Sequence, residues 1–201
     1  MSGVTGHLSM TLALACPELK FIVQEKAQPW LEDKFQEVLP KELKGTDRVK
    51  IMGHDRYAEQ PVKGAEVYFI STLLHKEPEE RGTTLIRRIA EAMDPKKSRL
   101  IVREIVMDAG DPRPEDATSN GTSNGGSHQA GLGPTGSITR LNIGIDLQML
   151  TLLNVFERTR AEWIAWFKEA DPRFKLKSCI QPVGNFAAVM EWVLEEEVVG
   201  F

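Results

Sequence analysis

The chain has 201 residues, of which 41% are hydrophobic and 27% charged, and its formal net charge at neutral pH is −4. These values indicate a globular protein with a sizeable core, and the acidic balance argues against a nucleic-acid-binding protein, which needs a basic face. Since no long apolar run and no basic segment followed by an apolar stretch occur, we expect neither a membrane span nor a signal peptide. Cys16 and Cys179 are the only cysteines, and we expect them to be reduced thiols of a cytoplasmic protein.

Helical and extended segments alternate along the first half of the chain. Apolar residues at helical spacing predict helices, whereas short apolar or alternating runs predict strands. In chain order we expect a helix over 7–16, a strand over 19–24, a helix over 28–38, strands over 48–52 and 65–72, a helix over 78–93 and a strand over 99–107. This alternation predicts an α/β fold with a mostly parallel sheet covered by helices.

The composition changes at residues 108–137, which are rich in Gly, Ser, Asn and Pro. A segment with so few large apolar side chains cannot offset the entropy cost of its own ordering, so we expect a flexible loop inserted in the domain.

Regular structure is expected to resume after this loop. The expected elements are helices over 142–156 and 159–170 and strands over 174–181 and 187–196, the two strands forming an antiparallel hairpin. Thr159 and Glu162 form a capping box at the start of the second helix. The stripe of Trp163, Trp166 and Phe167 in that helix predicts core packing.

A glycine turn opens the chain in "MSGVTGHLSM", where Gly3 and Gly6 precede the first helix. Backbone N–H groups at a helix N-terminus favour polar or anionic cofactors, and a carboxylate that closes the next strand, here Glu25, is the usual partner of ribose hydroxyls. The pattern fits either a dinucleotide or S-adenosylmethionine, and Gly3 alone is equally explained as a flexible terminus. Because Met1 stands where the first glycine of the dinucleotide fingerprint belongs, an NAD-dependent oxidoreductase is the less favoured reading.

Four segments of the sequence together resemble a known family. "SGVTGHLSMTLALACPELKFIVQE", "VKGAEVYFISTLLHKEPEE", "SRLIVREIVMD" and "DLQMLTLLNVFERTRAEW" occur in the order found in caffeic-acid-type O-methyltransferases of plants and fungi. Members of this family transfer a methyl group from S-adenosylmethionine to phenolic and polyketide hydroxyls. The resemblance covers nearly all of residues 1–201 except 108–137, and it implies a Rossmann-like class I methyltransferase sheet forming part of the family's C-terminal catalytic domain.

The resemblance implies a cofactor site and one acceptor-site residue. Gly3 and Gly6 match the turn beside the methionine part of S-adenosylmethionine, and Glu25 matches the acidic residue on its ribose. Asp55 matches a residue near the adenine, although by itself it is also explained as a turn residue. Met149 falls in the helix that lines the acceptor pocket of relatives.

The resemblance also implies a catalytic group that needs no metal. His75 matches the general base, and Glu104 and Glu157 match two acids that flank and orient its ring. Histidine suits this role because its pKa lies near neutrality, and a carboxylate on the far ring nitrogen fixes the tautomer. Taken singly, His75 could be a helix-entry residue, Glu104 a solvated strand end and Glu157 a loop acid.

Two features depart from the family pattern. Lys76 and Glu77 follow His75 where relatives carry Asp and Trp, so the packing of that Trp on the cofactor is in doubt. Lys76, if it lies close to His75, would lower the pKa of the imidazole. The loop over 108–137 is also longer than the usual connection.

The resemblance further implies that a dimerisation domain and a first, central strand precede the glycine turn in relatives. We expect both to be missing here, which would leave edges on two neighbouring strands. A truncated gene product, an incomplete gene model and a strand borrowed from a partner all account for this, and we favour truncation. The resemblance also suggests a homodimer, although we expect the family's dimerisation domain to be absent.

These observations lead to one expected function and two alternatives. We expect an S-adenosylmethionine-dependent O-methyltransferase that acts on a phenolic or polyketide hydroxyl, with neither a nucleic acid nor a membrane as partner. The alternatives are an inactive remnant that serves as a binding subunit and a methyltransferase-fold protein recruited to another step, such as a cyclisation.

Overall fold

The computed structural model describes residues 6–107, 134–182 and 187–196, and of residues 134–143 it describes the backbone alone. Gly3 and most of the glycine-rich segment, residues 108–133, therefore lie outside the described residues, as does the hairpin turn at Gly184 and Asn185.

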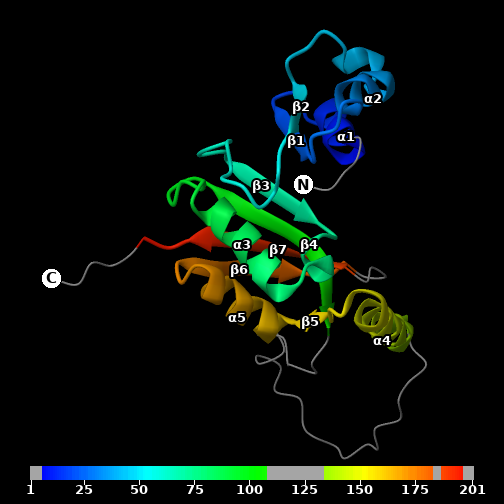
Figure 1. Cartoon of the computed structure of the whole chain (residues 1–201), viewed down its shortest axis with the longest axis vertical. Coiled ribbons are helices and arrows are strands. Elements are labelled where there is room, and N and C mark those ends of the chain that lie inside the picture. Colours follow the sequence, from blue (N-terminus) through cyan, green and yellow to red (C-terminus); the bar gives the residue numbers. More distant parts are fainter. Residues whose placement is uncertain (1–5, 108–133, 183–186, 197–201) are drawn as a thin grey trace, which may run out of the picture.

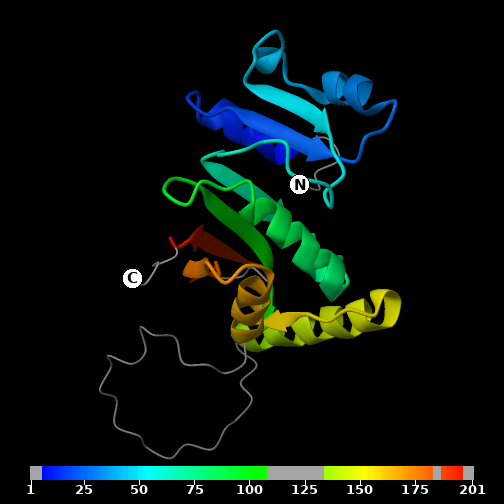
Figure 2. The ribbon, with the colours of Figure 1, turned by 60° about the vertical axis from the view of Figure 1, so that its left-hand side comes forward.

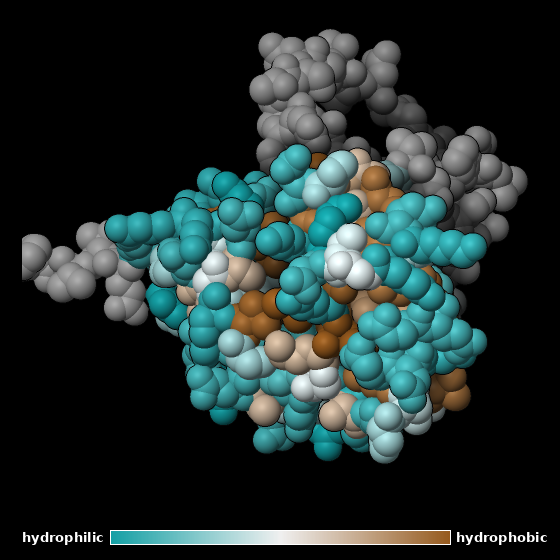
Figure 3. Space-filling model, turned by 90° about the horizontal axis from the view of Figure 1, so that it is seen from above, coloured by the Kyte–Doolittle hydropathy of each residue, from teal (hydrophilic) through white to brown (hydrophobic). Residues whose placement is uncertain are grey.

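An N-terminal unit contains two parallel strands and the helices that cover them (Figure 1). Its elements are α1 (His7–Ala15), β1 (Phe21–Glu25), α2 (Leu31–Val38), the short 3-10 helix η1 (Lys41–Leu43) and β2 (Val49–Gly53). The strands pair in parallel from Phe21 opposite Val49 to Glu25 opposite Gly53. Buried apolar side chains from all five elements form its own core: Met10, Ala13, Val23, Phe35, Leu39, Leu43 and Val49. Figure 3, seen from above, shows a mainly hydrophilic described surface with apolar side chains gathered near its middle.

The larger unit is a five-stranded mixed sheet with helices packed on it. Its elements are β3 (Val67–Ser71), the 3-10 helix η2 (Leu74–Lys76), α3 (Glu79–Ala90), β4 (Arg99–Met107), α4 (Pro134–Leu153), β5 (Arg158–Thr159), α5 (Arg160–Ala170), β6 (Phe174–Ile180) and β7 (Ala187–Leu194). The strand order is β3-β4-β7-β6, with β5 alongside the end of β4. β3 and β5 are parallel to β4, whereas β7 is antiparallel to both β4 and β6. The α/β fold with a C-terminal antiparallel hairpin is thereby confirmed.

Aromatic side chains fill the space between α5 and the hairpin, as the sequence predicted. Trp163, Trp166 and Phe167 are buried, and the ring of Phe167 stacks on Trp192 of β7 with a centroid distance of 4.0 Å. The capping box at Thr159 and Glu162 is present and fixes the start of α5.

Some boundaries differ from those expected. α4 begins at Pro134 rather than near 142, since proline is well suited to the first turn of a helix, where its missing N–H leaves no partner unsatisfied. η1 and β5 were not expected, because a two- or three-residue element has no periodicity to read.

The two units do not share one continuous sheet. β1 pairs only with β2, and β3 pairs only with β4, among the strands that the structure describes. Figure 2 shows the β1–β2 unit set apart from β3.

Helix packing generates a prediction at Gly82 of α3. A Cβ at this position would lie 2.2 Å from Cζ2 of Trp166, whose indole Nε1 donates to Thr83 at 2.8 Å and so resists displacement. We expect Gly82→Ala to lower the free energy of unfolding by about 1–3 kcal/mol, although alanine is the better helix former by about 1 kcal/mol.

This loss of stability is tested by urea denaturation of the Gly82→Ala variant, with Gly144→Ala as the control. A Cβ at Gly144 in α4 meets no atom within 4 Å, so this control is expected to be neutral or slightly stabilising. Equal effects in both variants would contradict the packing argument.

Candidate active site

His75 lies in the buried turn that follows β3. It belongs to η2, and only 5% of its surface is exposed. The chain enters this turn through Thr72, which has φ 47° and whose N–H donates to the carbonyl of Arg103 at 2.9 Å. A positive φ is rare for a β-branched residue, and such conformations concentrate at functional sites. No sequence pattern marked Thr72.

Glu104 holds that turn in place from the neighbouring strand. Its Oε1 accepts hydrogen bonds from the backbone N–H groups of Leu73 (2.7 Å) and Leu74 (2.8 Å). The side chain is fully buried, which rules out the alternative of a solvated strand end. Burial raises the pKa of the carboxyl, and the two backbone donors and His75 only partly oppose this.

Glu157 contacts the imidazole directly. Its Oε1 lies 2.8 Å from Nδ1 of His75, and its side chain is buried, so it is not a solvated loop acid. Its backbone N–H donates to Oδ1 of Asp146 in α4 at 2.6 Å. Asn154, three residues earlier in the same segment, has a positive φ of 53°. Asn adopts this left-handed conformation more readily than other non-glycine residues.

Arg158 fixes the segment that carries Glu157. Its guanidinium lies 3.8 Å from the ring centroid of Trp166 and is buried, and burial lowers its pKa. Strand β5 also pairs with β4 next to it, through Val106 opposite Arg158. The position of Glu157 is therefore set by stacking and by strand pairing.

These contacts leave one ring nitrogen of His75 without a partner. Oε2 of Glu104 lies 4.0 Å from Nδ1, on the side already occupied by Glu157. Among the described residues, Nε2 is buried and makes no hydrogen bond. If Nδ1 carries the proton and donates it to Glu157, Nε2 is a free base that can accept a proton.

The residues next to His75 differ in their surroundings. Lys76 is exposed, whereas Glu77 is buried and bonded to the phenol of Tyr57 at 2.6 Å. Arg56 also lies 3.4 Å from Glu77. Burial and this carboxylate raise the pKa of the Tyr57 phenol.

Arg56 also reaches the carboxylate of Glu25. Its Nη2 lies 4.0 Å from Oε1 of Glu25, which in addition accepts the backbone N–H of Lys26 at 3.0 Å. Glu25 ends β1, so this arginine joins the carboxyl end of β1 to the turn that follows β3. The sequence did not predict roles for Arg56 and Tyr57, because their partners, Glu25 and Glu77, lie far from them along the chain.

Gly6 forms the described part of the glycine turn. It precedes α1 with φ 71°, and a Cβ there would lie 2.9 Å from Cγ2 of Val23, so both conformation and space require glycine. The first N–H groups of α1 have no side-chain cap. The turn thus rests on β1 and offers backbone donors near the strand that ends at Glu25.

Asp55 and Met149 are placed apart from the His75 group. Asp55 is exposed, and its Oδ1 accepts the N–H of Tyr57 at 3.0 Å, as in a simple turn. Met149 is half-buried on α4, one turn after Asp146. Within the described part of the chain, neither residue forms a hydrogen bond or an ion pair with His75.

The described residues contain neither a metal-binding cluster nor a membrane-spanning helix. No group of three or more His, Cys, Asp or Glu side chains is arranged to hold a metal ion. In the same part of the chain, none of the helices combines the length and the apolarity that crossing a membrane requires.

No family model matches the chain. The O-methyltransferase fsr2 of Gibberella fujikuroi is 31% identical over 197 residues, which cover 98% of this chain and 45% of that protein. The O-methyltransferase xanE of Aspergillus fumigatus is 32% identical over 177 residues, covering 88% of this chain and 35% of that protein. The chain therefore spans less than half the length of these relatives.

Solved structures support the fold. LepI in complex with SAM matches with a TM-score of 0.72 and 22% identity, covering 97% of this chain and 42% of that one. A structure described as a pericyclic reaction enzyme matches with a TM-score of 0.71 and 21% identity, over 97% of this chain and 42% of that one.

The raised pKa of Glu104 predicts how pH affects stability. The folded state holds the proton of this carboxyl at pH values where the unfolded state, with its ordinary pKa near 4.5, has lost it. Stability contributed by the wild-type side chain should therefore fall as pH rises above about 4.5. Glu104→Gln keeps an oxygen for the Leu73 and Leu74 N–H groups and does not titrate.

Urea denaturation of both proteins between about pH 4 and pH 8 measures this difference. We expect the wild type to lose stability relative to Glu104→Gln with rising pH. A wild-type advantage that grows with pH would instead show that the buried carboxylate is stabilised in its charged form.

Proposed function

Because the chain belongs to the O-methyltransferase family of its fungal relatives, we propose that it carries the cofactor site and the general base of an S-adenosylmethionine-dependent O-methyltransferase. The substrate class that we propose is a phenolic or polyketide hydroxyl, and the location that we propose is the cytoplasm. The proposal rests on one observation above all: a buried imidazole, His75, with Glu157 on Nδ1 and no partner on Nε2 among the described residues.

The residues at the carboxyl end of β1 fit the proposed cofactor. S-adenosylmethionine supplies a methyl group on a sulfonium centre, together with ribose hydroxyls and a charged methionine portion. Glu25 would accept the ribose hydroxyls, and the uncapped N-terminus of α1 at Gly6 would face the polar portion. Gly3 and Asp55 complete the proposed set, the latter beside the adenine.

Nε2 of His75 would take the proton of the acceptor hydroxyl, which would prepare that oxygen to receive the methyl group that S-adenosylmethionine supplies. A phenolate is a far better nucleophile than a phenol, and a well-placed general base contributes about 10²–10⁴-fold to rate. Glu157 would hold the Nδ1 proton and stabilise the imidazolium that forms. Glu104 would act on the backbone, since its hydrogen bonds keep the η2 turn and hence the ring in place. Met149 is proposed to line the acceptor side from α4.

A second candidate uses the same site without methyl transfer. One structural neighbour is described as a pericyclic reaction enzyme, and another was solved with SAM bound. In this chain, Glu77 places a buried carboxylate bonded to Tyr57 next to the His75 turn. A protein that binds the cofactor and returns a product of unchanged mass would fit this candidate.

Cofactor binding is tested by calorimetry with S-adenosylmethionine. We expect saturable binding to the wild type, with stabilisation against unfolding of about 2.7 kcal/mol at 100 times the dissociation constant. Glu25→Gln removes a charged acceptor and is expected to weaken binding roughly ten-fold or more. Absence of binding to the wild type would overturn the proposal.

The role of His75 is tested separately, with a panel of small phenols and mass spectrometry of the products. We expect His75→Gln to bind the cofactor as the wild type does and to transfer methyl groups about 10²–10⁴-fold more slowly. Unchanged transfer by His75→Gln would remove the histidine from the mechanism. Products of unchanged mass from the wild type would favour the second candidate.

A further inference from the structure

An arginine joins two carboxylates, one at the end of β1 and one in the turn that follows β3. Nη2 of Arg56 lies 4.0 Å from Oε1 of Glu25, and Nη1 lies 3.4 Å from Oε1 of Glu77. Oε2 of Glu77 in turn accepts a hydrogen bond from the phenol of Tyr57 at 2.6 Å. We call Glu25, Arg56, Tyr57 and Glu77 the arginine cluster.

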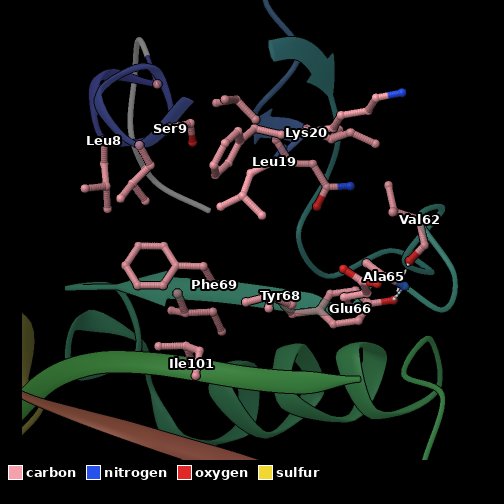
Figure 4. Close-up of a pocket in the computed structure, with 18 of the residues that line it drawn as sticks. Leu8, Ser9, Leu19, Lys20, Val62, Ala65, Glu66, Tyr68, Phe69 and Ile101 are labelled. Carbon is pink, nitrogen blue, oxygen red and sulfur yellow. Dashed lines mark hydrogen bonds between the residues drawn. The ribbon is translucent and has the colours of Figure 1, made fainter. Parts of the chain in front are cut away.

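The arginine cluster lies outside the large cavity of the structure. That cavity measures about 1090 Å³ and is lined by α1 and β1 on one side and by β3 on the other (Figure 4). Gly6 lines the cavity, whereas none of the four residues of the arginine cluster does. The exposed part of the Arg56 side chain is therefore reached from outside this cavity.

Two ion pairs fix the plane of the Arg56 guanidinium. A guanidinium is flat and carries its N–H donors in a rigid fork. Because its two terminal nitrogens face two different carboxylates, Glu25 and Glu77, a rotation of the group would lengthen at least one of the two ion pairs. The side chain of Arg56 nevertheless stays 25% exposed, so a ligand can reach it.

Glu77 is itself held in position. It is buried, and its bond to the Tyr57 phenol fixes one carboxylate oxygen. The backbone N–H of Tyr57 donates to Oδ1 of Asp55 at 3.0 Å, and the guanidinium of Arg81 in α3 lies 5.6 Å from the centre of the Tyr57 ring. The carboxylate that holds Arg56 is therefore anchored from two sides.

Arg56 lies where a nucleoside bound to Glu25 would carry its base. Under the proposed function, Glu25 accepts the ribose hydroxyls, and the base is bonded to that same ribose ring. The guanidinium is 4.0 Å from the Glu25 carboxylate, so the ribose and the base that it carries come within reach of Arg56. A guanidinium is weakly hydrated for a cation and stacks readily on the face of an aromatic ring.

We propose that Arg56 binds the cofactor by stacking its guanidinium on the adenine ring of S-adenosylmethionine, and that Glu77 is the positioning residue that holds the guanidinium plane. The proposal rests on the proposed function, which places the ribose at Glu25. Stacking uses the face of the guanidinium, whereas the ion pairs to Glu25 and Glu77 use its edge. The base can therefore bind without breaking the contacts that orient Arg56.

The first measurement is calorimetry with S-adenosylhomocysteine, which carries the nucleoside of the cofactor and has no methyl group to transfer. Arg56→Lys keeps the charge but removes the plane, and we expect it to weaken binding about ten-fold. Glu77→Gln keeps an acceptor for Tyr57 but loses the ion pair, and we expect a loss of about three-fold. Arg88→Lys is the matched control, because Arg88 pairs with Glu91 at an exposed part of α3, and we expect it to bind as the wild type does.

The second measurement reports the stacked contact itself and is made on the wild type. The Nε–H proton of Arg56 is assigned in nuclear magnetic resonance spectra by its absence from the Arg56→Lys spectrum, and S-adenosylhomocysteine is then added. A proton over the face of an aromatic ring is shielded, so we expect this signal to move upfield. A hydrogen bond from this N–H to the ligand would instead move it downfield.

Unchanged affinity in Arg56→Lys, or a downfield shift of the Arg56 signal, would overturn this proposal while the proposed function stands. Equal weakening in Arg56→Lys and Arg88→Lys would also overturn it, because the effect would then not come from the arginine cluster. If the wild type binds neither S-adenosylhomocysteine nor S-adenosylmethionine, the proposed cofactor site itself fails, and this proposal fails with it.

Discussion

The site depends on the hydrogen bonds that Glu104 accepts from the backbone at the start of the η2 turn. A carboxylate in the middle of a buried strand is costly, and two backbone donors, Leu73 and Leu74, together with the nearby His75 ring, offset that cost only in part. The two hydrogen bonds in turn fix the backbone that leads into His75, whose Nδ1 lies 2.8 Å from Oε1 of Glu157. Thr72 lies three residues before His75, and Asn154 lies three residues before Glu157. Both adopt left-handed backbone conformations that the packed surroundings must maintain.

The fold could be predicted from the sequence wherever the hydrophobic periodicity is strong. The strands at 65–72 and 99–107, the stripe of Trp163 and its neighbours, and the capping box at Thr159 all form as expected, because local pattern and tertiary burial favour the same outcome there. The start of α4 was missed because "PTGSITR" has neither apolar periodicity nor a strong helix-forming composition.

The candidate site was accessible only in part. No spacing rule joins His75 to Glu157, which lie far apart in sequence, and only the family resemblance placed the two acids beside the ring. Arg56 and Tyr57 were not predicted as site residues. Both contact Glu77, and at that position the sequence departs from the family pattern. A long-range contact of this kind leaves no local pattern in the sequence. The turn at Asp55 does have such a pattern, and it needs no ligand to explain it.

Arg56 gives the protein an energetic link between its two units. Because one guanidinium lies within 4.0 Å of both Glu25 and Glu77, a change in its distance from either carboxylate alters the electrostatic potential at the other. A molecule that displaces Arg56 from Glu25 would consequently shift the balance of charge beside the histidine turn. Thermodynamic reciprocity then requires that a molecule which perturbs Glu77 change the affinity of the first molecule at Glu25 by the same factor. Two molecules bound beside these two carboxylates would thus affect each other's binding through a single side chain.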